Sequence, residues 1–282
     1  MSNILITGAK GQLGTELRKR LGESPEIFYT DADTLDITTE EKVKNFIEQN
    51  KIHTVINCAA YTAVDKAEEE PEQADSVNNL GVGYLAKYAD VIVHISTDYV
   101  FDGTGNLPYK PEDKTNPVSV YGKTKLAGEF AVLEEAKTAV IIRTAWVYAP
   151  DGKNFVNTML RLGKEREQLT VVADQIGSPT HAGDLAQAII DILPKIKEDT
   201  KNIYHFTDEG VCSWYDFAVA IMEEAGLNCK VKPIETWEYP TKAVRPAYSV
   251  LNKSKIKNDF GINTRHWREA LRECIKEKSV NL

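Results

Sequence analysis

The amino-acid sequence predicts an α/β fold in which helices cover both faces of a parallel β-sheet, followed by a smaller C-terminal region. Three observations lead to this prediction. Short β-rich runs alternate with helical stretches through the first half of the 282-residue chain. The first of these runs leads into a turn that carries Gly8, Gly11 and Gly14. After Pro150 the alternation loosens, which indicates a second region.

Each element of the first half has its own local pattern. The run Asn3 to Thr7 is short and mainly apolar, as expected for a strand buried on both faces. The next segment carries Leu13, Leu17 and Leu21 four residues apart, which places them on one face of a helix. Thr38 and Glu41 have the spacing of a capping box at the start of the second helix. We expect strands at 3–7, 26–30, 54–57, 91–96 and 139–143, and helices at 12–21, 38–50, 73–88 and 120–134.

The second half is expected to contain further helices at 153–164, 183–193, 213–225 and 265–276. The stretch 231–246 is rich in proline and aromatic residues and is expected to be irregular. A strand at 203–206 could return to the main sheet. We therefore expect a dinucleotide-binding domain at 1–150 and a mainly substrate-binding region at 151–282. The boundary is not sharp if elements from the second region join the main sheet.

Composition excludes several classes of function. The net charge is -8, and neutralising a polyanion requires clustered Lys and Arg, so no nucleic-acid partner is expected. No apolar run approaches the roughly 20 residues that span a bilayer, so no membrane partner is expected. Residues 1–7 lack the basic start of a signal peptide, and the scattered Cys58, Cys212, Cys229 and Cys274 form no CxxC pair. A cytoplasmic protein with reduced thiols is the expectation.

The glycine turn predicts a nucleotide site of the Rossmann type on a doubly wound sheet. Gly8 permits a tight turn out of the first strand, Gly11 lets the backbone approach a pyrophosphate, and Gly14 allows the helix to pack closely on the sheet. The helix that follows points its N-terminal amides at the phosphates. Because the turn lies between a strand and an amphipathic helix, dinucleotide binding is favoured over a plain loop.

The choice between NADH and NADPH stays open on sequence. Asp31 and Asp33 follow the second strand, where an acid binds the adenosine ribose and disfavours a 2′-phosphate. Lys10, within the glycine turn, could instead pair with that phosphate. The two signals oppose each other.

The predicted catalytic residues are Thr97, Tyr121 and Lys125. On a helix, Tyr121 and Lys125 lie one turn apart on the same face. A tyrosine has a pKa of about 10, and a nearby cation lowers it, so the pair could exchange a proton with a carbonyl oxygen. Thr97, at the end of the fourth strand, could hydrogen-bond to the same oxygen. Without the glycine turn and Thr97, the spacing of Tyr121 and Lys125 would indicate only a pair of residues on the protein surface.

Longer motifs resemble a known family, the dTDP-4-dehydrorhamnose reductases of the extended short-chain dehydrogenase/reductase superfamily. They span nearly the whole chain: NCAAYTAVDKAEEEPE (57–72), STDYVFDGTG (96–105), YGKTKLAGE (121–129), RTAWVYA (143–149), DQIGSPT (174–180) and RPAYSVL (245–251). The resemblance implies that NADPH or NADH reduces the C4 ketone of dTDP-4-dehydro-β-L-rhamnose, giving dTDP-L-rhamnose.

The resemblance also implies roles for individual residues. Tyr121 would protonate the C4 oxygen, while Lys125 would hold the nicotinamide ribose and tune Tyr121. The residues implied to bind the cofactor are Gly8, Gly11, Gln12, Leu13, Gly14, Asp31, Asp36, Ile37, Ala60, Tyr61, Thr62, Tyr121 and Lys125. The residues implied to bind the dTDP-sugar are Thr97, Asp98, Trp146 and Arg245; a guanidinium such as that of Arg245 suits a diphosphate.

Three questions remain open on sequence. Some members of the family form metal-linked dimers, and Glu16 aligns with one metal ligand there, but no other ligand matches. Mg²⁺ dependence is therefore open, as is the choice between a monomer and a homodimer.

Another nucleotide-sugar epimerase or reductase is an alternative function. Dehydratases of the superfamily place Asp-Glu after the catalytic Thr, whereas this chain has Asp98-Tyr99. The absence of the Glu favours simple reduction over dehydration. The last alternative is a non-catalytic, dinucleotide-binding regulatory subunit.

Overall fold

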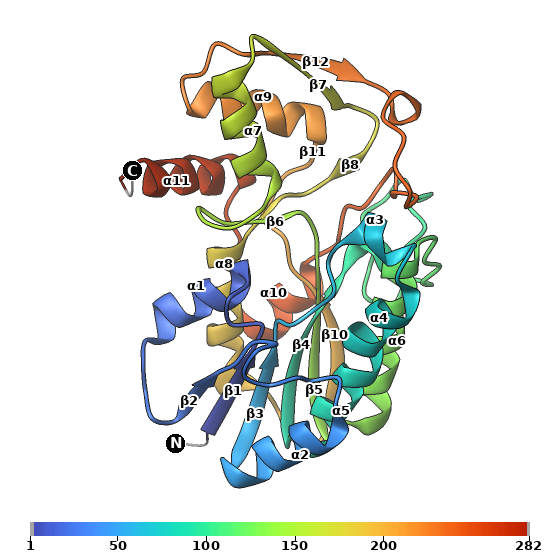
Figure 1. The fold of residues 1–282 in the computed structure, drawn as a ribbon, viewed down its shortest axis with the longest axis vertical. Coiled ribbons are helices and arrows are strands. Elements are labelled where there is room, and N and C mark those ends of the chain that lie inside the picture. The colour runs from blue at the N-terminus through green and yellow to red at the C-terminus, as the bar shows by residue number, and fades with distance from the viewer. Residues whose placement is uncertain (1–2, 281–282) are drawn as a thin grey trace.

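The computed structural model describes residues 3–280 of the chain. Its centre is a six-stranded sheet with the order β10-β5-β4-β3-β1-β2, and every neighbouring pair of strands is parallel. The predicted α/β fold with a Rossmann-type, doubly wound sheet is thus confirmed (Figure 1). The strands are β1 (Asn3–Thr7), β2 (Ile27–Tyr29), β3 (Ile52–Asn57), β4 (Val91–Thr97), β5 (Thr138–Thr144) and β10 (Lys201–His205).

Side chains alternate between the two faces of the sheet and build a core on each. On one face, Ile6 and Ile56 pack with helices α1 (Gln12–Leu21), α8 (Ala182–Ile192) and α10 (Ser254–Phe260). On the other, Leu5 and Val55 pack with α2 (Glu40–Gln49), α5 (Gly81–Tyr88) and α6 (Val120–Glu135). Both faces are therefore dry, which explains why the strands are apolar runs rather than alternating polar and apolar residues.

The predicted elements of the first half are present, with two differences at helix ends. The predicted helix at 73–88 consists of α4 (Pro71–Asp75), a π-helical segment Ser76–Leu80 and α5, preceded by the short α3 (Val64–Ala67). The capping box of Thr38 and Glu41 is wrong. Helix α2 begins after Thr39 and has no side-chain cap, and the Thr38 hydroxyl donates a hydrogen bond of 2.6 Å to Asp36.

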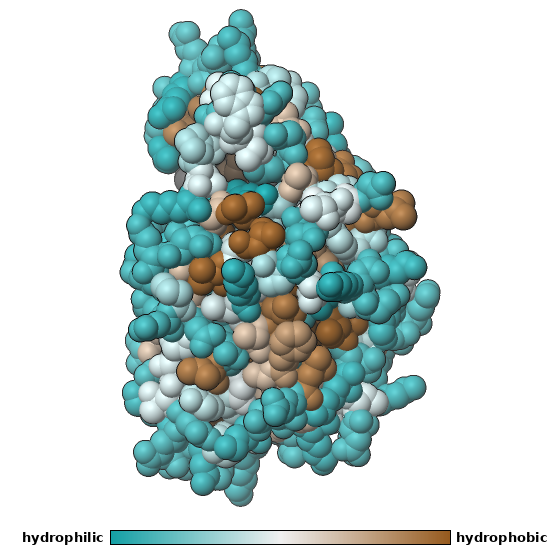
Figure 2. Space-filling view, turned by 90° about the vertical axis from the view of Figure 1, so that its right-hand side faces the viewer, coloured by the Kyte–Doolittle hydropathy of each residue, from teal (hydrophilic) through white to brown (hydrophobic). Residues whose placement is uncertain are grey.

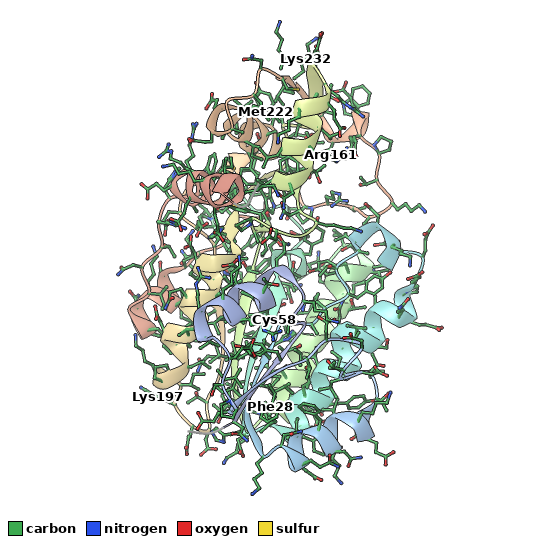
Figure 3. All side chains as sticks on the ribbon, turned by 60° about the vertical axis from the view of Figure 1, so that its left-hand side comes forward. Phe28, Cys58, Arg161, Lys197, Met222 and Lys232 are labelled. Carbon is green, nitrogen blue, oxygen red and sulfur yellow. The ribbon has the colours of Figure 1, made fainter. Side chains whose placement is uncertain are left out.

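The C-terminal region has a core of its own. The long elements are α7 (Phe155–Glu165), α9 (Trp214–Glu224) and α11 (Trp267–Val280), and they pack around Phe217, Ile221 and Leu271. Its short strands are β6 (Val147–Tyr148), β7 (Gln168–Val172), β8 (Ile176–Gly177), β9 (Thr180–His181), β11 (Cys212–Ser213) and β12 (Lys230–Ile234). In Figure 3, Met222 and Lys232 mark the far end of this region, while Cys58 lies near the middle of the molecule.

Two expectations about the second half have different outcomes. The strand expected at 203–206 does return to the main sheet, as β10, which pairs in parallel with β5. The stretch 231–246 is not wholly irregular, because its first residues belong to β12, which pairs in parallel with β7. Pro233 is tolerated there because β12 is an edge strand of a two-stranded sheet. No helix among residues 3–280 is long and apolar enough to cross a membrane.

Candidate active site

A cavity of about 1150 Å³ lies at the carboxyl ends of the parallel strands. The residues that end or follow β1 to β5 contribute to its wall, as expected for a ligand site on an open α/β sheet. It collects all but two of the residues predicted for the site. Those that line it are Gly8, Gly11, Gln12, Leu13, Gly14, Asp31, Asp36, Ile37, Ala60, Tyr61, Thr62, Thr97, Asp98, Tyr121, Lys125 and Trp146. Arg245 and Glu16 lie elsewhere.

The glycine turn forms one end of this cavity. Gly8 has a φ of +63°, and a Cβ there would lie 2.7 Å from the amide nitrogen of Ala59, so the turn requires glycine at this position. A Cβ on Gly14 would collide with the Gly8 carbonyl, which shows how closely α1 packs on the turn. The N-terminus of α1 has no side-chain cap and no acid in its first turn. Its amides can therefore receive phosphate oxygens, and the turn fits a dinucleotide.

The residues expected around the adenosine already have partners within the chain. Asp31 accepts a hydrogen bond of 2.9 Å from the Lys10 amide, and the Lys10 ammonium forms an ion pair with Asp33. The hydrogen bond that Lys10 donates to the Asp33 carboxylate raises the pKa of Lys10. Asp36 accepts hydrogen bonds from the hydroxyls of Thr38 and Thr39, which hold the pKa of its carboxyl at about 2. Asp36 thus also fixes the entry into α2.

The loop after β3 is held by a residue that the sequence did not single out. Asn78, in the π-helical segment, is fully buried and accepts a hydrogen bond of 2.8 Å from the Tyr61 amide. Its side-chain amide donates to the Tyr61 carbonyl at 3.1 Å and to Thr124 at 3.1 Å. Asn78 therefore ties the loop of Ala60 to Thr62 onto α6. No sequence pattern identifies Asn78, because its partners are distant along the chain and an asparagine inside a helical pattern indicates only a solvent-facing residue.

Thr97, Tyr121 and Lys125 converge in the middle of the cavity. Tyr121 and Lys125 lie on the first turns of α6, which begins after the capping hydroxyl of Ser119, and Thr97 ends β4. The Thr97 hydroxyl is close enough to hydrogen-bond to Tyr121 and donates a bond of 3.0 Å to Asp98. Lys125 is fully buried, and its ammonium donates to the Ile95 carbonyl at 2.6 Å. Hydroxyl, phenol and amine thus line one wall.

Burial shifts the pKa values of Tyr121 and Lys125 in opposite directions. It raises the pKa of Tyr121 above its ordinary value, and the Thr97 hydrogen bond opposes this. That Lys125 lowers the pKa of Tyr121 stays a prediction for the protein with its cofactor bound. Burial also lowers the pKa of Lys125 to about 8. Tyr121 is a neutral phenol at neutral pH, which is the form that a proton donor requires.

Trp146 adopts a strained backbone and stacks on a second tryptophan. Its φ is +50°, a left-handed conformation rare for a bulky side chain. Its ring stacks on that of Trp214, with centroids 3.6 Å apart and planes at 11°. Both indoles line the cavity, and such strain tends to occur at ligand sites. Trp214 was missed because sequence patterns do not reveal that the start of α9 reaches the loop after β5.

Asp98 and Arg245 lie at different depths. Asp98 is buried in the cavity wall, burial raises the pKa of its carboxyl to about 6, and one of its oxygens has no partner among the described residues. Arg245 is absent from this wall and lines a neighbouring cavity of about 460 Å³. Its guanidinium donates to Asp65 at 2.7 Å and to the Tyr99 hydroxyl at 3.3 Å. The carboxylate of Asp65 thus holds the cation behind Tyr99.

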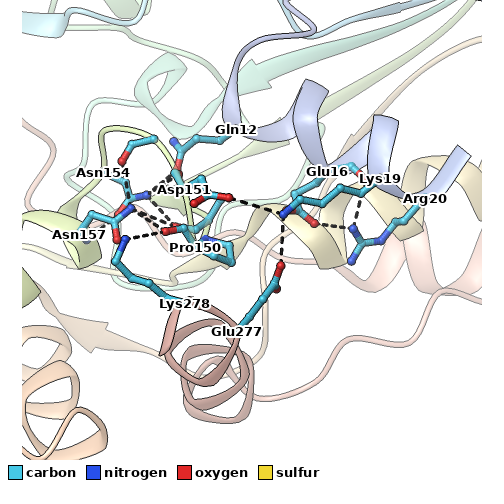
Figure 4. Close-up of polar contacts among 12 residues, drawn as sticks. Gln12, Glu16, Lys19, Arg20, Pro150, Asp151, Asn154, Asn157, Glu277 and Lys278 are labelled. Atoms are coloured by element: carbon cyan, nitrogen blue, oxygen red, sulfur yellow. Dashed lines mark hydrogen bonds and ion pairs between the residues drawn. The ribbon is translucent and has the colours of Figure 1, made fainter. Parts of the chain in front are cut away.

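Glu16 is engaged in ion pairs rather than in a cluster of acids. It lies on α1, almost fully buried, and accepts hydrogen bonds from Lys19 at 2.8 Å and from Arg20 at 2.5 Å (Figure 4). Burial alone would raise the pKa of its carboxyl, but the two cations hold it below the ordinary value. Among residues 3–280 no group of three or more Cys, His, Asp or Glu side chains could hold a metal ion. These surroundings do not fit Mg²⁺.

Comparisons with known proteins agree with the geometry. The family model described as "RmlD substrate binding domain" matches residues 1–280. A dTDP-4-dehydrorhamnose reductase from Aggregatibacter actinomycetemcomitans is 47% identical, over 96% of this chain and 98% of its own.

Solved structures show the same relationship. A dTDP-4-dehydrorhamnose reductase from Clostridium acetobutylicum is 45% identical with a TM-score of 0.94, over 98% of this chain and 99% of its own. One from Bacillus anthracis, solved in complex with NADP, is 38% identical with a TM-score of 0.92, over 98% of this chain and 100% of its own. The chain therefore belongs to the RmlD substrate binding domain family, the family of the dTDP-4-dehydrorhamnose reductases that it matches over nearly their whole length.

Proposed function

We propose that this protein uses NADPH or NADH to reduce the C4 ketone of dTDP-4-dehydro-β-L-rhamnose to the alcohol, giving dTDP-L-rhamnose. One observation carries the proposal. Thr97, Tyr121 and Lys125 share a cavity with an open glycine turn, so a proton donor and a dinucleotide site meet at one place. The name of the relatives that cover nearly the whole chain supplies the substrate.

The chemistry divides between the cofactor and the chain. Bound nicotinamide supplies the hydride that adds to the ketone carbon. Tyr121 gives its phenolic proton to the oxygen that becomes the alcohol, and Thr97 hydrogen-bonds to that oxygen. Lys125 would hold the nicotinamide ribose. There its ammonium would favour the phenolate that Tyr121 becomes after giving up its proton.

The dinucleotide site would be built from the glycine turn and the neighbouring loops. Gly8, Gly11, Gln12, Leu13 and Gly14 would surround the diphosphate. Asp31, Asp36 and Ile37 would lie at the adenosine, and Ala60, Tyr61 and Thr62 along the rest of the cofactor. Lys10 can bind a 2′-phosphate only by giving up Asp33, so NADPH and NADH both stay in the proposal. Competing NADPH and NADH kinetics on one preparation decide the preference.

The sugar site would lie between Asp98 and the stacked indoles. The free oxygen of Asp98 would accept a hydrogen bond from a sugar hydroxyl, and Trp146 would stack on the sugar ring. Arg245 would bind the diphosphate of the dTDP-sugar after leaving Asp65. Of these substrate-side residues, Asp98 and Trp146 follow the ends of β4 and β5, and Arg245 lies within residues 151–282. The glycine turn and the loops that would hold the dinucleotide all lie within residues 1–150.

The test is turnover. Protein is mixed with NADPH and dTDP-4-dehydrorhamnose, and the absorbance of the reduced nicotinamide is followed; a separate titration measures NADPH binding without the sugar. Steady oxidation with formation of dTDP-L-rhamnose supports the proposal. If NADPH binds but is not oxidised, the proposed reductase function is wrong and a non-catalytic regulatory subunit is favoured. A sugar product altered without net oxidation favours an epimerase.

The remaining expectations concern assembly and location. We infer a cytoplasmic enzyme that is a monomer or a homodimer. Figure 2 shows hydrophobic side chains gathered on the face of the molecule that carries α4, α5 and α6. Leu80 is 46% exposed and Phe130 is 59% exposed, and the elements that carry them pack together there. This surface favours the homodimer, and light scattering of the purified protein would distinguish the two states.

A further inference from the structure

The segment between β6 and α7 brings the C-terminal region against the glycine turn. The side-chain amide of Asn154 donates a hydrogen bond of 2.8 Å to the Gln12 side chain (Figure 4). Gln12 in turn donates to the Val147 carbonyl at 3.5 Å. A Cβ built on Gly152 would lie 3.4 Å from Cγ of Gln12. The residues around position 153 therefore lie beside the first turn of α1.

This segment is fixed at several points along its backbone. Asn154 also donates to the Ala149 carbonyl at 2.9 Å, and its side-chain oxygen caps α7 by accepting from the Asn157 amide at 2.8 Å. Asn157 donates to the Gly152 carbonyl at 3.0 Å. From α11, Lys278 donates to the Pro150 carbonyl at 3.0 Å. The backbone that carries Lys153 is thus held at a defined place on the cavity rim.

Cations on the cavity wall are few, and they differ in their partners. Lys10, Lys125 and Lys153 are the described Lys, Arg and His residues that line it. Lys10 is paired with Asp33, and Lys125 donates to the Ile95 carbonyl. Lys153 has neither a hydrogen bond nor an ion pair with any described residue. A free ammonium therefore lines the cavity on the segment that contacts Gln12.

We propose that Lys153 binds the diphosphate of the dinucleotide, beside the first turn of α1. The diphosphate carries two negative charges, whereas the glycine turn offers only backbone amides and no cation of its own that is free. An ammonium beside the turn would complete the site. The contacts of Gly152 and Asn154 with Gln12 favour the diphosphate of the cofactor over that of a nucleotide-sugar. The inference rests on the proposed use of NAD(P)H but not on the identity of the sugar.

The decisive experiment measures cofactor binding without any sugar substrate. NADPH and NADH are titrated separately into the wild type and Lys153→Met, and energy transfer from tryptophan to the nicotinamide reports binding. The expected result is a Kd raised about tenfold for both cofactors, since losing one charge-assisted hydrogen bond has this size. The Kd of the variant should also depend less steeply on salt. Lys153→Arg keeps the charge and should restore most of the affinity.

Lys164→Met is the matched control, because Lys164 is an exposed lysine at the opposite end of α7. It should leave both Kd values unchanged. Unchanged Kd values in Lys153→Met overturn the inference. A loss for NADPH alone also overturns it, because it would place Lys153 at the 2′-phosphate. So does a higher KM for the dTDP-sugar with unaltered cofactor binding. If the wild type does not turn over the dTDP-sugar, the proposed function is wrong, but the comparison of cofactor Kd values between the wild type and Lys153→Met still tests the role of Lys153.

Discussion

At the scale of single residues, burial decides the chemistry of the site. The types of residue are evident from the sequence, because Thr97, Tyr121 and Lys125 form a recognisable set and the cavity brings them together. Their protonation is not evident, because it depends on desolvation and on partners distant along the chain. The Ile95 carbonyl, for example, accepts a hydrogen bond from the Lys125 ammonium, and no sequence pattern links these two residues. The residue types of the site are thus predictable from the sequence, whereas their protonation requires the structure.

Replacing the proposed acid tests this view. Tyr121→Phe removes the phenolic proton and keeps the ring, so we expect kcat to fall about 10²- to 10⁴-fold while cofactor affinity stays near that of the wild type. Tyr99→Phe is a suitable control, because the Tyr99 ring packs edge-on against Tyr121 with centroids 5.4 Å apart and lines the same cavity. The control should keep most of kcat. A near-normal rate in Tyr121→Phe would mean that another group is the acid.

The buried ammonium of Lys125 leads to a second prediction, which concerns how the stability of the protein depends on pH. Burial lowers its pKa to about 8, whereas the unfolded chain keeps the proton to about 10.5. Between these pH values the unfolded state binds more protons, so the free energy of unfolding rises with pH. Below about pH 8 the buried ammonium costs up to about 3 kcal/mol.

Lys125→Met should therefore stabilise the cofactor-free protein near neutral pH, although losing the hydrogen bond to Ile95 offsets about 1 kcal/mol of the gain. The difference from the wild type should shrink by about pH 9.5. Urea midpoints of the two proteins without cofactor, at about pH 7 and about pH 9.5, give the measurement. An equal difference in stability between Lys125→Met and the wild type at both pH values would contradict the assigned pKa shift of Lys125. The variant should also have lost activity.

At the scale of elements, prediction succeeded where the signal was local. The strands and helices of the first half follow from apolar periodicity, and α1 occupies the predicted residues. The pairing of β7 with β12 was missed, because it depends on contact between segments far apart in the chain and includes a proline. The predicted capping box is absent because α2 begins one residue later, after Thr39, and no side chain caps it. Junctions between elements, such as that of Asn154 with Gln12, have no sequence signature.

That junction can be tested by separating its two roles. Asn154→Ser keeps an oxygen that can cap α7 but lacks the amide that donates to Gln12. We expect thermal stability to change little, while KM for NADPH rises several-fold and KM for the dTDP-sugar stays the same. Steady-state kinetics in both substrates, alongside a melting curve, provide the check. A large fall in the melting temperature would instead show that the hydrogen bonds of Asn154 to Ala149 mainly hold the fold.

At the scale of the whole molecule, the two regions depend on each other. β10, from the second half, forms the edge of the main sheet beside β5, and α8 and α10 cover one of its faces. In return, Lys278 of α11 holds Pro150, and Glu277 pairs with Lys19 of α1 at 3.2 Å (Figure 4). The predicted division at about residue 150 therefore does not separate two independent folding units.

A fragment of residues 1–150 should consequently fail to fold by itself. Without β10 and α8 it would expose the edge of β5 and the apolar face around Ile6 and Ile56, which invites association between strands. We expect aggregation in size-exclusion chromatography and no binding of NADPH, with the full chain as the control. A monomeric fragment with a cooperative melting transition would contradict this expectation.

The return of β10 to the sheet also has a consequence for synthesis on the ribosome. Strands β1 to β5 emerge early, yet the sheet is completed only after His205 has left the exit tunnel, and α11 is made later still. During that interval a half-built sheet with one open edge is present in the cell. The growing chain would then depend on chaperones or rapid translation of its second half, and slow codons between β5 and β10 would lower the yield of active enzyme.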